Sequence, residues 1–477
     1  MINKEIIEMK YNKLAMNTFL FFIANFGSKF ISFFMVPLYT FALTTSEYGT
    51  VDIIQSTVML LTPFVSFGIG DIVVLYLVQK REPIEKTVSN AIVMLALGNS
   101  VILLFILLLD KIGLFTNYVL FLIILVFLQS FYTILQSIAR GLDKVKLFAL
   151  SGILYTVVLV TMNYLLLVKF NSKINGYLIS LVLSNLVCCL YLISKLKLNQ
   201  FLHFSCIDFE MIKKVLKLSI PLLPTAILWT LMNVADKYTI VFFNGTSGNG
   251  IYTVAHKIPT IIATLYSIFQ SAWQIATFEF SSKSERSQSY SSLFELLTCA
   301  LFIIGSILIL VCEPFVVVFC EKSYYSAWNV MNILVLSSVY NALSGFLGSN
   351  YIPMNNTVGA LKITFMGTLI NVILNIILVA TIGIKGAAIS TCISFLYMVI
   401  KKMYDTRDFT PLNIKYNRFV MSNILLLVQI ILFQFSNSFV IYSINTLISI
   451  LLIFTYIDVI KLLVKNVIHK VKRRWIK

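Results

Sequence analysis

The chain has 477 residues, of which 59% are hydrophobic and 12% are charged. A soluble domain has roughly 45–50% apolar and about 25% charged residues, so this composition excludes a soluble class and indicates a membrane protein. The 37 Lys and Arg outnumber the 20 Asp and Glu and give a net charge of +17, yet no basic soluble domain is present to bind nucleic acid, and nucleic-acid partners are not expected.

Apolar runs of about 18–28 residues recur along the chain, each long enough to cross a hydrocarbon core of about 30 Å. We predict an all-α polytopic membrane protein with fourteen spanning helices. In chain order they cover 17–42, 51–78, 88–109, 115–138, 147–168, 174–194, 218–243, 251–278, 288–312, 328–351, 358–381, 384–400, 419–436 and 438–460.

The positive charges are distributed unevenly between the two sides of these helices. Of the 37 Lys and Arg, 29 fall in the termini and in the loops on the side of the N-terminus, 5 in the opposite loops and 3 within spans, with Lys362 and Lys385, near span ends, counted with the adjacent loops. Because cytoplasmic loops carry the excess of Lys and Arg, both termini are predicted to be cytoplasmic. The net charge then reflects orientation and contact with anionic membrane lipids.

Two pairs of segments indicate an internal repeat. SEYGTVDIIQSTVMLLTPFVSFG at 46–68 resembles SGNGIYTVAHKIPTIIATLYSIF at 247–269, and each has a Gly at the mouth of a helix, Gly49 or Gly250. The segments 163–186 and 375–396 also align, on their Asn and Gly residues. Helices 1–6 are therefore predicted to be a parallel copy of helices 7–12, related by an axis along the membrane normal.

This repeat predicts two pseudo-symmetric six-helix bundles around a central cavity, followed by two extra helices. The joint carries IDFEMIKKVLKL, which is typical of a short amphipathic helix at the membrane interface. The predicted parts are an N-terminal lobe at 1–194, a cytoplasmic amphipathic linker at 195–217, a C-terminal lobe at 218–404, and two helices with a basic tail at 405–477.

Polar side chains recur at helical spacing on predicted helices 1, 2, 4, 7, 8 and 10. A single Ser or Thr in such a stripe is explained by one hydrogen bond between helices. An ionised group at the same depth needs water or an oppositely charged partner. We therefore predict a wet cavity whose lining includes Asn25, Lys29, Arg140, Asn233, Asp236, Lys237, Lys257, Gln270 and Gln274.

The ionised members of that set leave two interpretations open. Asp236 pairs with Lys29 or Lys257 and neutralises it, or the ammonium groups of Lys29, Lys237 and Lys257 together make the cavity positive. A positive cavity suits an anion such as a phosphate or pyrophosphate.

A second role for titratable groups is ion coupling. Asp71, Asp236 and His256 are the candidates, and packing is the competing interpretation of His256, whose unperturbed pKa is near neutral. The seven cysteines show no C-x-x-C spacing and are interpreted as small buried hydrophobic residues, so no metal site is expected.

Motifs of catalysis are absent from the sequence. It contains no G-x-x-x-x-G-K-[ST], no G-x-S-x-G and no H-E-x-x-H pattern, so neither ATP hydrolysis nor a hydrolase site is indicated. We expect no enzyme activity and no cofactor.

Several stretches carry a resemblance to a known family. KLSIPLLPTAILWTLMNVADKYTIVFF at 217–243, GIYTVAHKIPTIIATLYSIFQSAW at 250–273, FGSKFISFFMVPLYTFALTTSEYG at 26–49 and YSAWNVMNILVLSSVYNAL at 325–343 are similar to the Wzx-type polysaccharide biosynthesis, or oligosaccharide flippase, family. The resemblance implies the multidrug/oligosaccharidyl-lipid/polysaccharide exporter fold, with a basic lumen and, in some members, an ion gradient.

The resemblance also implies a function. A polyprenyl-pyrophosphate-linked oligosaccharide would move from the inner to the outer leaflet of the cytoplasmic membrane by alternating access, for surface polysaccharide such as lipopolysaccharide or capsule. An H⁺ or Na⁺ gradient, a polysaccharide polymerase and glycosyltransferases would be its partners. The alternative is a cation-coupled multidrug antiporter of the related extrusion branch, which would need an unpaired carboxylate in the cavity.

Overall fold

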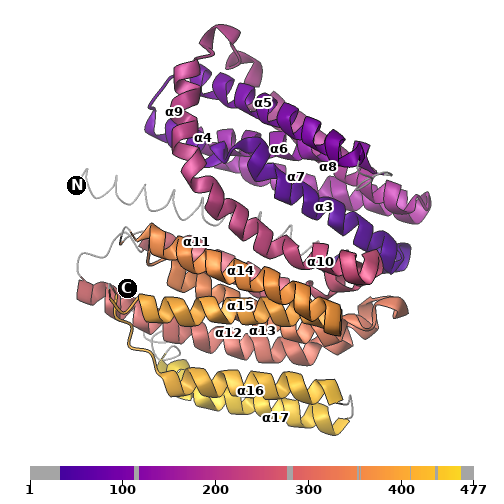
Figure 1. The fold of residues 1–477 in the computed structure, drawn as a ribbon, viewed down its shortest axis with the longest axis vertical. Helices are drawn as coiled ribbons and strands as arrows, with labels where there is room; N and C mark the ends of the chain where they lie inside the picture. Colours follow the sequence, from indigo (N-terminus) through magenta and orange to yellow (C-terminus); the bar gives the residue numbers. More distant parts are fainter. Residues whose placement is uncertain are drawn as a thin grey trace, which may run out of the picture. The chain divides into compact units, whose positions relative to one another are not determined.

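The computed structural model describes residues 33–111, 118–276, 283–351, 354, 356–408, 410–435 and 439–462. Its contacts divide the chain into two compact units, Met1–Gly250 and Ile251–Lys477. Each unit is built from helices alone in its described residues (Figure 1). The predicted all-α membrane architecture is therefore confirmed, while the division into two lobes, a linker and a C-terminal part with two helices stays a prediction.

Unit 1 contains the helices of the first half of the chain and most of α10. They are α2 (Val36–Ala42), α3 (Thr45–Ser66), α4 (Ile69–Gln79), α5 (Ile84–Lys111), α6 (Val119–Gly141), α7 (Val145–Asn163), α8 (Lys173–Leu196), α9 (Phe209–Ser219) and α10 (Leu223–Ala255). Helix α6 lies at the centre of the packing, because it contacts α3, α4, α5, α7 and α8.

The linker between α8 and α10 contains the predicted amphipathic helix. Asp208 begins α9 by accepting a hydrogen bond from the Glu210 N–H at 2.8 Å, which satisfies one of the otherwise unpaired donors at a helix start. Met211, Ile212 and Val215 are buried on one side of α9, where the helix packs on α4 and α5. The amphipathic pattern of the sequence therefore matches the observed burial.

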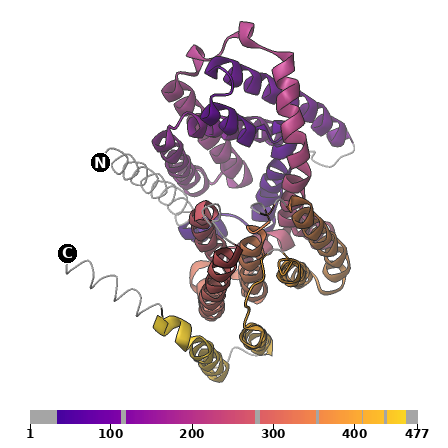
Figure 2. The ribbon, with the colours of Figure 1, turned by 90° about the vertical axis from the view of Figure 1, so that its left-hand side faces the viewer.

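Unit 2 contains α11 (Pro259–Ala276), α12 (Lys283–Phe319), α13 (Ala327–Gly348), α14 (Thr357–Ile382), α15 (Ile384–Asp405), α16 (Tyr416–Phe435) and α17 (Phe439–Thr455). Helices α13, α14 and α15 form the most closely packed group, and α16 and α17 pack on each other and on α12 (Figure 2). A buried polar cluster makes this last attachment: the Ser306 hydroxyl donates to Gln429 Oε1 at 2.9 Å and lies 2.8 Å from the Ser449 hydroxyl.

Ten helices in the described residues are long and apolar enough to cross a membrane, or eleven if the bent pair α3 and α4 is one span. The fourteen predicted spans nearly all have a helical counterpart. The first, 17–42, lies mostly outside the described residues; α17 is shorter than a full span at 17 residues, and α11 falls outside the ten. The protein is a multi-pass membrane protein.

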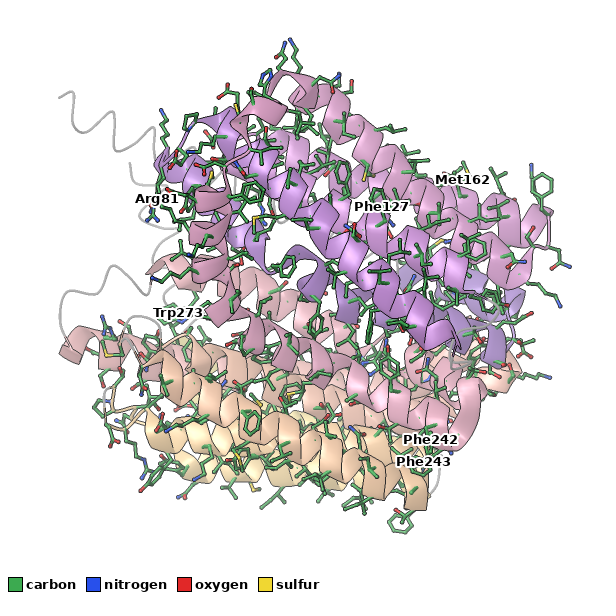
Figure 3. All side chains as sticks on the ribbon, turned by 45° about the horizontal axis from the view of Figure 1, so that its top comes forward. Arg81, Phe127, Met162, Phe242, Phe243 and Trp273 are labelled. Atoms are coloured by element: carbon green, nitrogen blue, oxygen red, sulfur yellow. The ribbon has the colours of Figure 1, made fainter. Side chains whose placement is uncertain are left out.

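Burial is distributed as a bilayer requires. Large apolar side chains are exposed on the helices, including Phe127 at 50% and Phe242 at 81%, both labelled in Figure 3. Small polar residues are buried instead, among them Ser151, Ser180 and Ser184 at 0% exposure. Hydrocarbon surrounds the outside of such a protein, while hydroxyl and amide groups hold its helices together from within.

Two of the predicted spans are bent or broken in the described residues. Helix α3 begins with a capping box between Thr44 and Glu47 and ends where Gly68 takes a left-handed φ of 65°, so that α4 continues at an angle of 50°. The predicted span 251–278 is likewise interrupted, because residues 256–258 form a turn and Pro259 begins α11. The span predicted as continuous there is wrong: proline favours the first position of a new helix.

Candidate functional site

The two glycines that the sequence repeat aligned lie against each other's backbone. A Cβ atom added to Gly49 would lie 1.8 Å from the Thr246 carbonyl oxygen, and one added to Gly250 would lie 1.9 Å from the Thr45 carbonyl oxygen. Only glycine fits either position, since a real Cβ needs about 3.3 Å from an oxygen. We call this arrangement the glycine contact.

Hydroxyl groups reinforce the glycine contact with the same reciprocity. Thr45 Oγ1 lies 2.7 Å from Ser247 Oγ, and Ser46 Oγ lies 2.7 Å from Thr246 Oγ1. The two Thr-Ser pairs thus bond to each other crosswise, the Thr of each segment with the Ser of the other. The chain reaches this geometry because Gly245 takes a φ of 72°, which interrupts α10 just before the contact.

An ion pair lies two helical turns from the start of α3. Lys237 Nζ on α10 is 2.9 Å from Asp52 Oδ2 and 3.0 Å from Oδ1 on α3, and the side chains are only 19% and 10% exposed. Asn249 donates from Nδ2 both to Asp52 Oδ2 at 3.2 Å and to the Gly49 carbonyl at 2.9 Å. The amide therefore joins the ion pair to the glycine contact.

A cavity of about 490 Å³ opens further along the same helices, within the range of small-molecule sites. Its wall combines apolar side chains with a polar set, which is Gln55, Thr62, Gln129, Thr133, Tyr155, Asn185 and Thr230. None of its twelve described lining residues is charged. Gln55 follows Asp52 by one turn of α3, so the ion pair lies near one end of the cavity.

The remaining predicted site residues of unit 1 are dispersed. Arg140 donates to Ser137 Oγ at 3.1 Å and its guanidinium lies 5.6 Å from the Phe148 ring centroid. Asn233 is exposed and donates to the Trp229 carbonyl at 2.6 Å. Among the candidates for ion coupling, Asp236 is 3% exposed. Asp71 is exposed in the first turn of α4, where the negative charge of a carboxylate interacts favourably with the helix dipole.

The predicted site residues of unit 2 lie around the helix break. His256 and Lys257 are half-buried in the turn before α11, and the His256 ring meets the Tyr252 ring edge-on at 4.7 Å between centroids. Gln270 is half-buried on α11. Asn25 and Lys29 lie outside the described residues, as does the side chain of Gln274.

Two residues of the site escaped the sequence analysis as site residues. Asp52 lies in the predicted span 51–78 but was not among the predicted lining residues, and Asn249 lies between the predicted spans 218–243 and 251–278. The signal for Asp52 was the same as for Lys237, an ionisable group inside an apolar run, which needs a partner at that depth. The partner of the Lys237 ammonium is the Asp52 carboxylate, so Lys237 belongs to the site as one half of an ion pair.

Comparison with known proteins places the chain in a family. The sequence model of the family described as polysaccharide biosynthesis protein matches residues 14–274, more than half of the chain. The chain belongs to the polysaccharide biosynthesis protein family. This is a family of membrane flippases and transporters, so the predicted resemblance and the expectation of a non-enzyme are both confirmed.

Individual relatives of this polysaccharide biosynthesis protein agree with the family. A probable low-salt glycan biosynthesis flippase of Haloferax volcanii is 24% identical over 187 residues, which are 38% of this chain and 39% of that protein. The chain thus aligns with about two fifths of the length of that curated relative.

Solved structures show the fold. The lipid II flippase MurJ in an inward closed conformation matches with a TM-score of 0.69 at 16% identity, covering 93% of this chain and 100% of that one. An inward-facing multidrug resistance MATE family transporter of the MOP superfamily matches at 0.65 and 11% identity, over 82% and 100% of the two chains. The chain therefore has a MurJ- and MATE-like fold.

Proposed function

We propose that this protein moves a polyprenyl-pyrophosphate-linked oligosaccharide from the inner to the outer leaflet of the cytoplasmic membrane for surface polysaccharide biosynthesis. The observation that carries the proposal is the family membership, together with a cavity in unit 1 that is partly lined by amide and hydroxyl side chains and has the Lys237–Asp52 ion pair near one end. The glycan and pyrophosphate cannot cross hydrocarbon unaided, whereas the polyprenyl tail can remain in it. A polar cavity that opens to each side in turn lowers that barrier.

The cavity chemistry supports a glycan better than a cationic drug. Amide and hydroxyl groups such as those of Gln55, Gln129 and Thr230 donate and accept hydrogen bonds, as sugar hydroxyls require. Lys237 lies near one end of this cavity, paired with Asp52, and ammonium groups bind phosphates. Lys29 and Lys257 complete the proposed basic lining, together with the other residues predicted from the sequence.

The two-lobe organisation also belongs to the proposal. Besides the glycine contact, Gly176 and Gly386 support the repeat: a Cβ on Gly176 would lie 3.3 Å from the Leu166 carbonyl oxygen, and one on Gly386 2.2 Å from that of Leu378. The sequence repeat pairs both glycines and both leucines. We infer two six-helix bundles related by this repeat, cytoplasmic termini, and the glycine contact on the outer side.

The alternative is a cation-coupled multidrug antiporter, which the likeness to a MATE family fold favours. An antiporter of this kind needs a carboxylate that can bind a cation or proton. Asp52 is already paired with Lys237, and the described cavity lining is uncharged, so the flippase is the better-supported function. Cells expressing an antiporter would gain resistance to cationic dyes, and a flippase would give none.

The decisive experiment removes Lys237, which lies near one end of the cavity, in cells that depend on this gene for surface glycan. We expect Lys237→Ala to abolish surface glycan and to leave lipid-linked oligosaccharide in the inner leaflet, while the protein remains inserted. Lys146→Ala is the matched control, because Lys146 is exposed. Normal glycan export by Lys237→Ala would contradict the proposed role of the cation.

A further inference from the structure

Asn249 occupies a position that links two separate features of unit 1. Its side chain is 0% exposed, and its Nδ2 reaches the Gly49 carbonyl and the Asp52 carboxylate at once, at 2.9 Å and 3.2 Å. Asp52 in turn holds Lys237 through both of its oxygens. The side chains of Asp52 and Asn249 thus connect Lys237 to the glycine contact.

The connection runs between α3 and α10 along their facing sides. Farther along, the Thr57 hydroxyl lies 2.7 Å from the Tyr238 hydroxyl, so the two helices are held together on both sides of the ion pair. Separating the glycine contact would stretch the bond from Asn249 to the Gly49 carbonyl first, since the amide is buried there. The cost of opening therefore depends on whether Asp52 keeps Asn249 in place.

We propose that Asp52 and Asn249 are positioning residues that keep the glycine contact closed while Lys237 is paired with Asp52, and that the phosphate groups of the cargo open it by taking Lys237 away. This inference rests on the proposed function for the identity of the anion. In this mechanism the Lys237–Asp52 ion pair detects the phosphate groups of the cargo, which neither residue could do alone.

The chemistry of the exchange favours the phosphates. A pyrophosphate carries more charge and more acceptor oxygens than one carboxylate, so it competes for an ammonium group by charge-assisted hydrogen bonds. Asp52 then remains as a largely buried carboxylate without its cation, which is strongly unfavourable unless water reaches it. Opening the glycine contact admits that water, and so the departure of Lys237 favours the open arrangement.

Hydrogen exchange on the purified full chain in lipid nanodiscs tests the inference. Peptides covering 45–57 and 245–255 report the glycine contact, and a peptide covering 145–163 in α7 serves as an internal control. We expect Asn249→Ala to speed exchange about eightfold in the first two peptides, because it removes two hydrogen bonds and each is worth roughly a threefold shift. Asp52→Asn should act in the same direction, and the α7 peptide should not change.

Inorganic pyrophosphate is the probe for the anion. In the unmodified protein it should speed exchange at both reporting peptides relative to sodium chloride of equal ionic strength. Lys237→Gln should remove this response, and Lys146→Gln should retain it. In Asn249→Ala the contact is already released, so pyrophosphate should add little.

Three results would overturn the inference. Unchanged exchange in both Asn249→Ala and Asp52→Asn would show that these residues do not hold the contact. A pyrophosphate effect that is absent from the unmodified protein, or equal in Lys237→Gln, would reject the role of the anion. If the exchange results hold while cells with Lys237→Ala still export glycan, the positioning role stands and the proposed cargo is wrong.

Discussion

Replacing Gly49 with alanine should force the glycine contact apart. The added Cβ would lie 1.8 Å from the Thr246 carbonyl oxygen, whereas carbon and oxygen need about 3.3 Å, so the segments must separate by about 1.5 Å. The two hydroxyl pairs, now 2.7 Å apart, would then exceed hydrogen-bonding distance. With the bond from Asn249 to the Gly49 carbonyl, three bonds worth about 0.6 kcal/mol each would be lost, about 2 kcal/mol in total.

A loss of about 2 kcal/mol changes the ratio of closed to open molecules by about thirtyfold. Cysteines at Ser46→Cys and Thr246→Cys provide the assay, because the hydroxyl oxygens that they replace are 2.7 Å apart, and a disulfide can form there under mild oxidation. A protease site after the exposed Gln200 separates the two fragments unless they are cross-linked.

We expect the Gly49→Ala variant of this cysteine pair to cross-link at least about tenfold more slowly, because the clash excludes the closed geometry itself. Gly152→Ala is the control: a Cβ at Gly152 meets nothing within 4 Å, and cross-linking should be unaffected. Cross-linking at the original rate in an inserted Gly49→Ala protein would refute the argument that backbone contact closes this end of unit 1.

Three further changes act in unit 2. Gln429→Leu should destabilise the attachment of α16 and α17 by about 1 kcal/mol, since it removes the bond from the Ser306 hydroxyl; an unchanged thermal unfolding midpoint in detergent would contradict this. Gly386→Ala should lower that midpoint more, because its Cβ would lie 2.2 Å from a carbonyl oxygen and overpacking costs about 1–3 kcal/mol. The hydrogen bond from Arg418 lowers the pKa of Asp458, so its stabilisation should be present above the usual Asp pKa and vanish as pH falls through the lowered value. Arg418→Met should therefore lower the midpoint at pH 7 and have less effect at pH 3.

The fold was predictable where the bilayer imposes it. Apolar runs in the described part of the chain become helices, although some bounds differ, as where α10 runs to Ala255 past the predicted end at 243. An unpaired backbone amide in hydrocarbon is too costly for any other structure. Pro63 and Gly70 lie inside the predicted second span, 51–78, and the bend occurs between them at Gly68. Pro259 likewise indicates the break before α11, but it lies within an apolar run long enough to be predicted as one continuous span.

The site was less predictable because it depends on distances between segments far apart in the chain. Lys237 and Asp52 are 185 residues apart, and hydropathy contains no information on which ionisable group faces which. The sequence indicated that each needs a partner at that depth, and it offered Asp236 with Lys29 or Lys257 as one solution. The packing of α3 against α10 selects another pair.

The glycine contact is made by two equivalent segments of one chain. Two copies of T-S-x-x-G, at 45–49 and 246–250, meet as equivalent patches do across the two-fold axis of a homodimer. In a homodimer both patches would carry identical residues. Within one chain the copies can differ, and Tyr48 stands where the other copy has Asn249. The hydrogen bonds of Asn249 are therefore asymmetric, although the two glycines of the contact are equivalent.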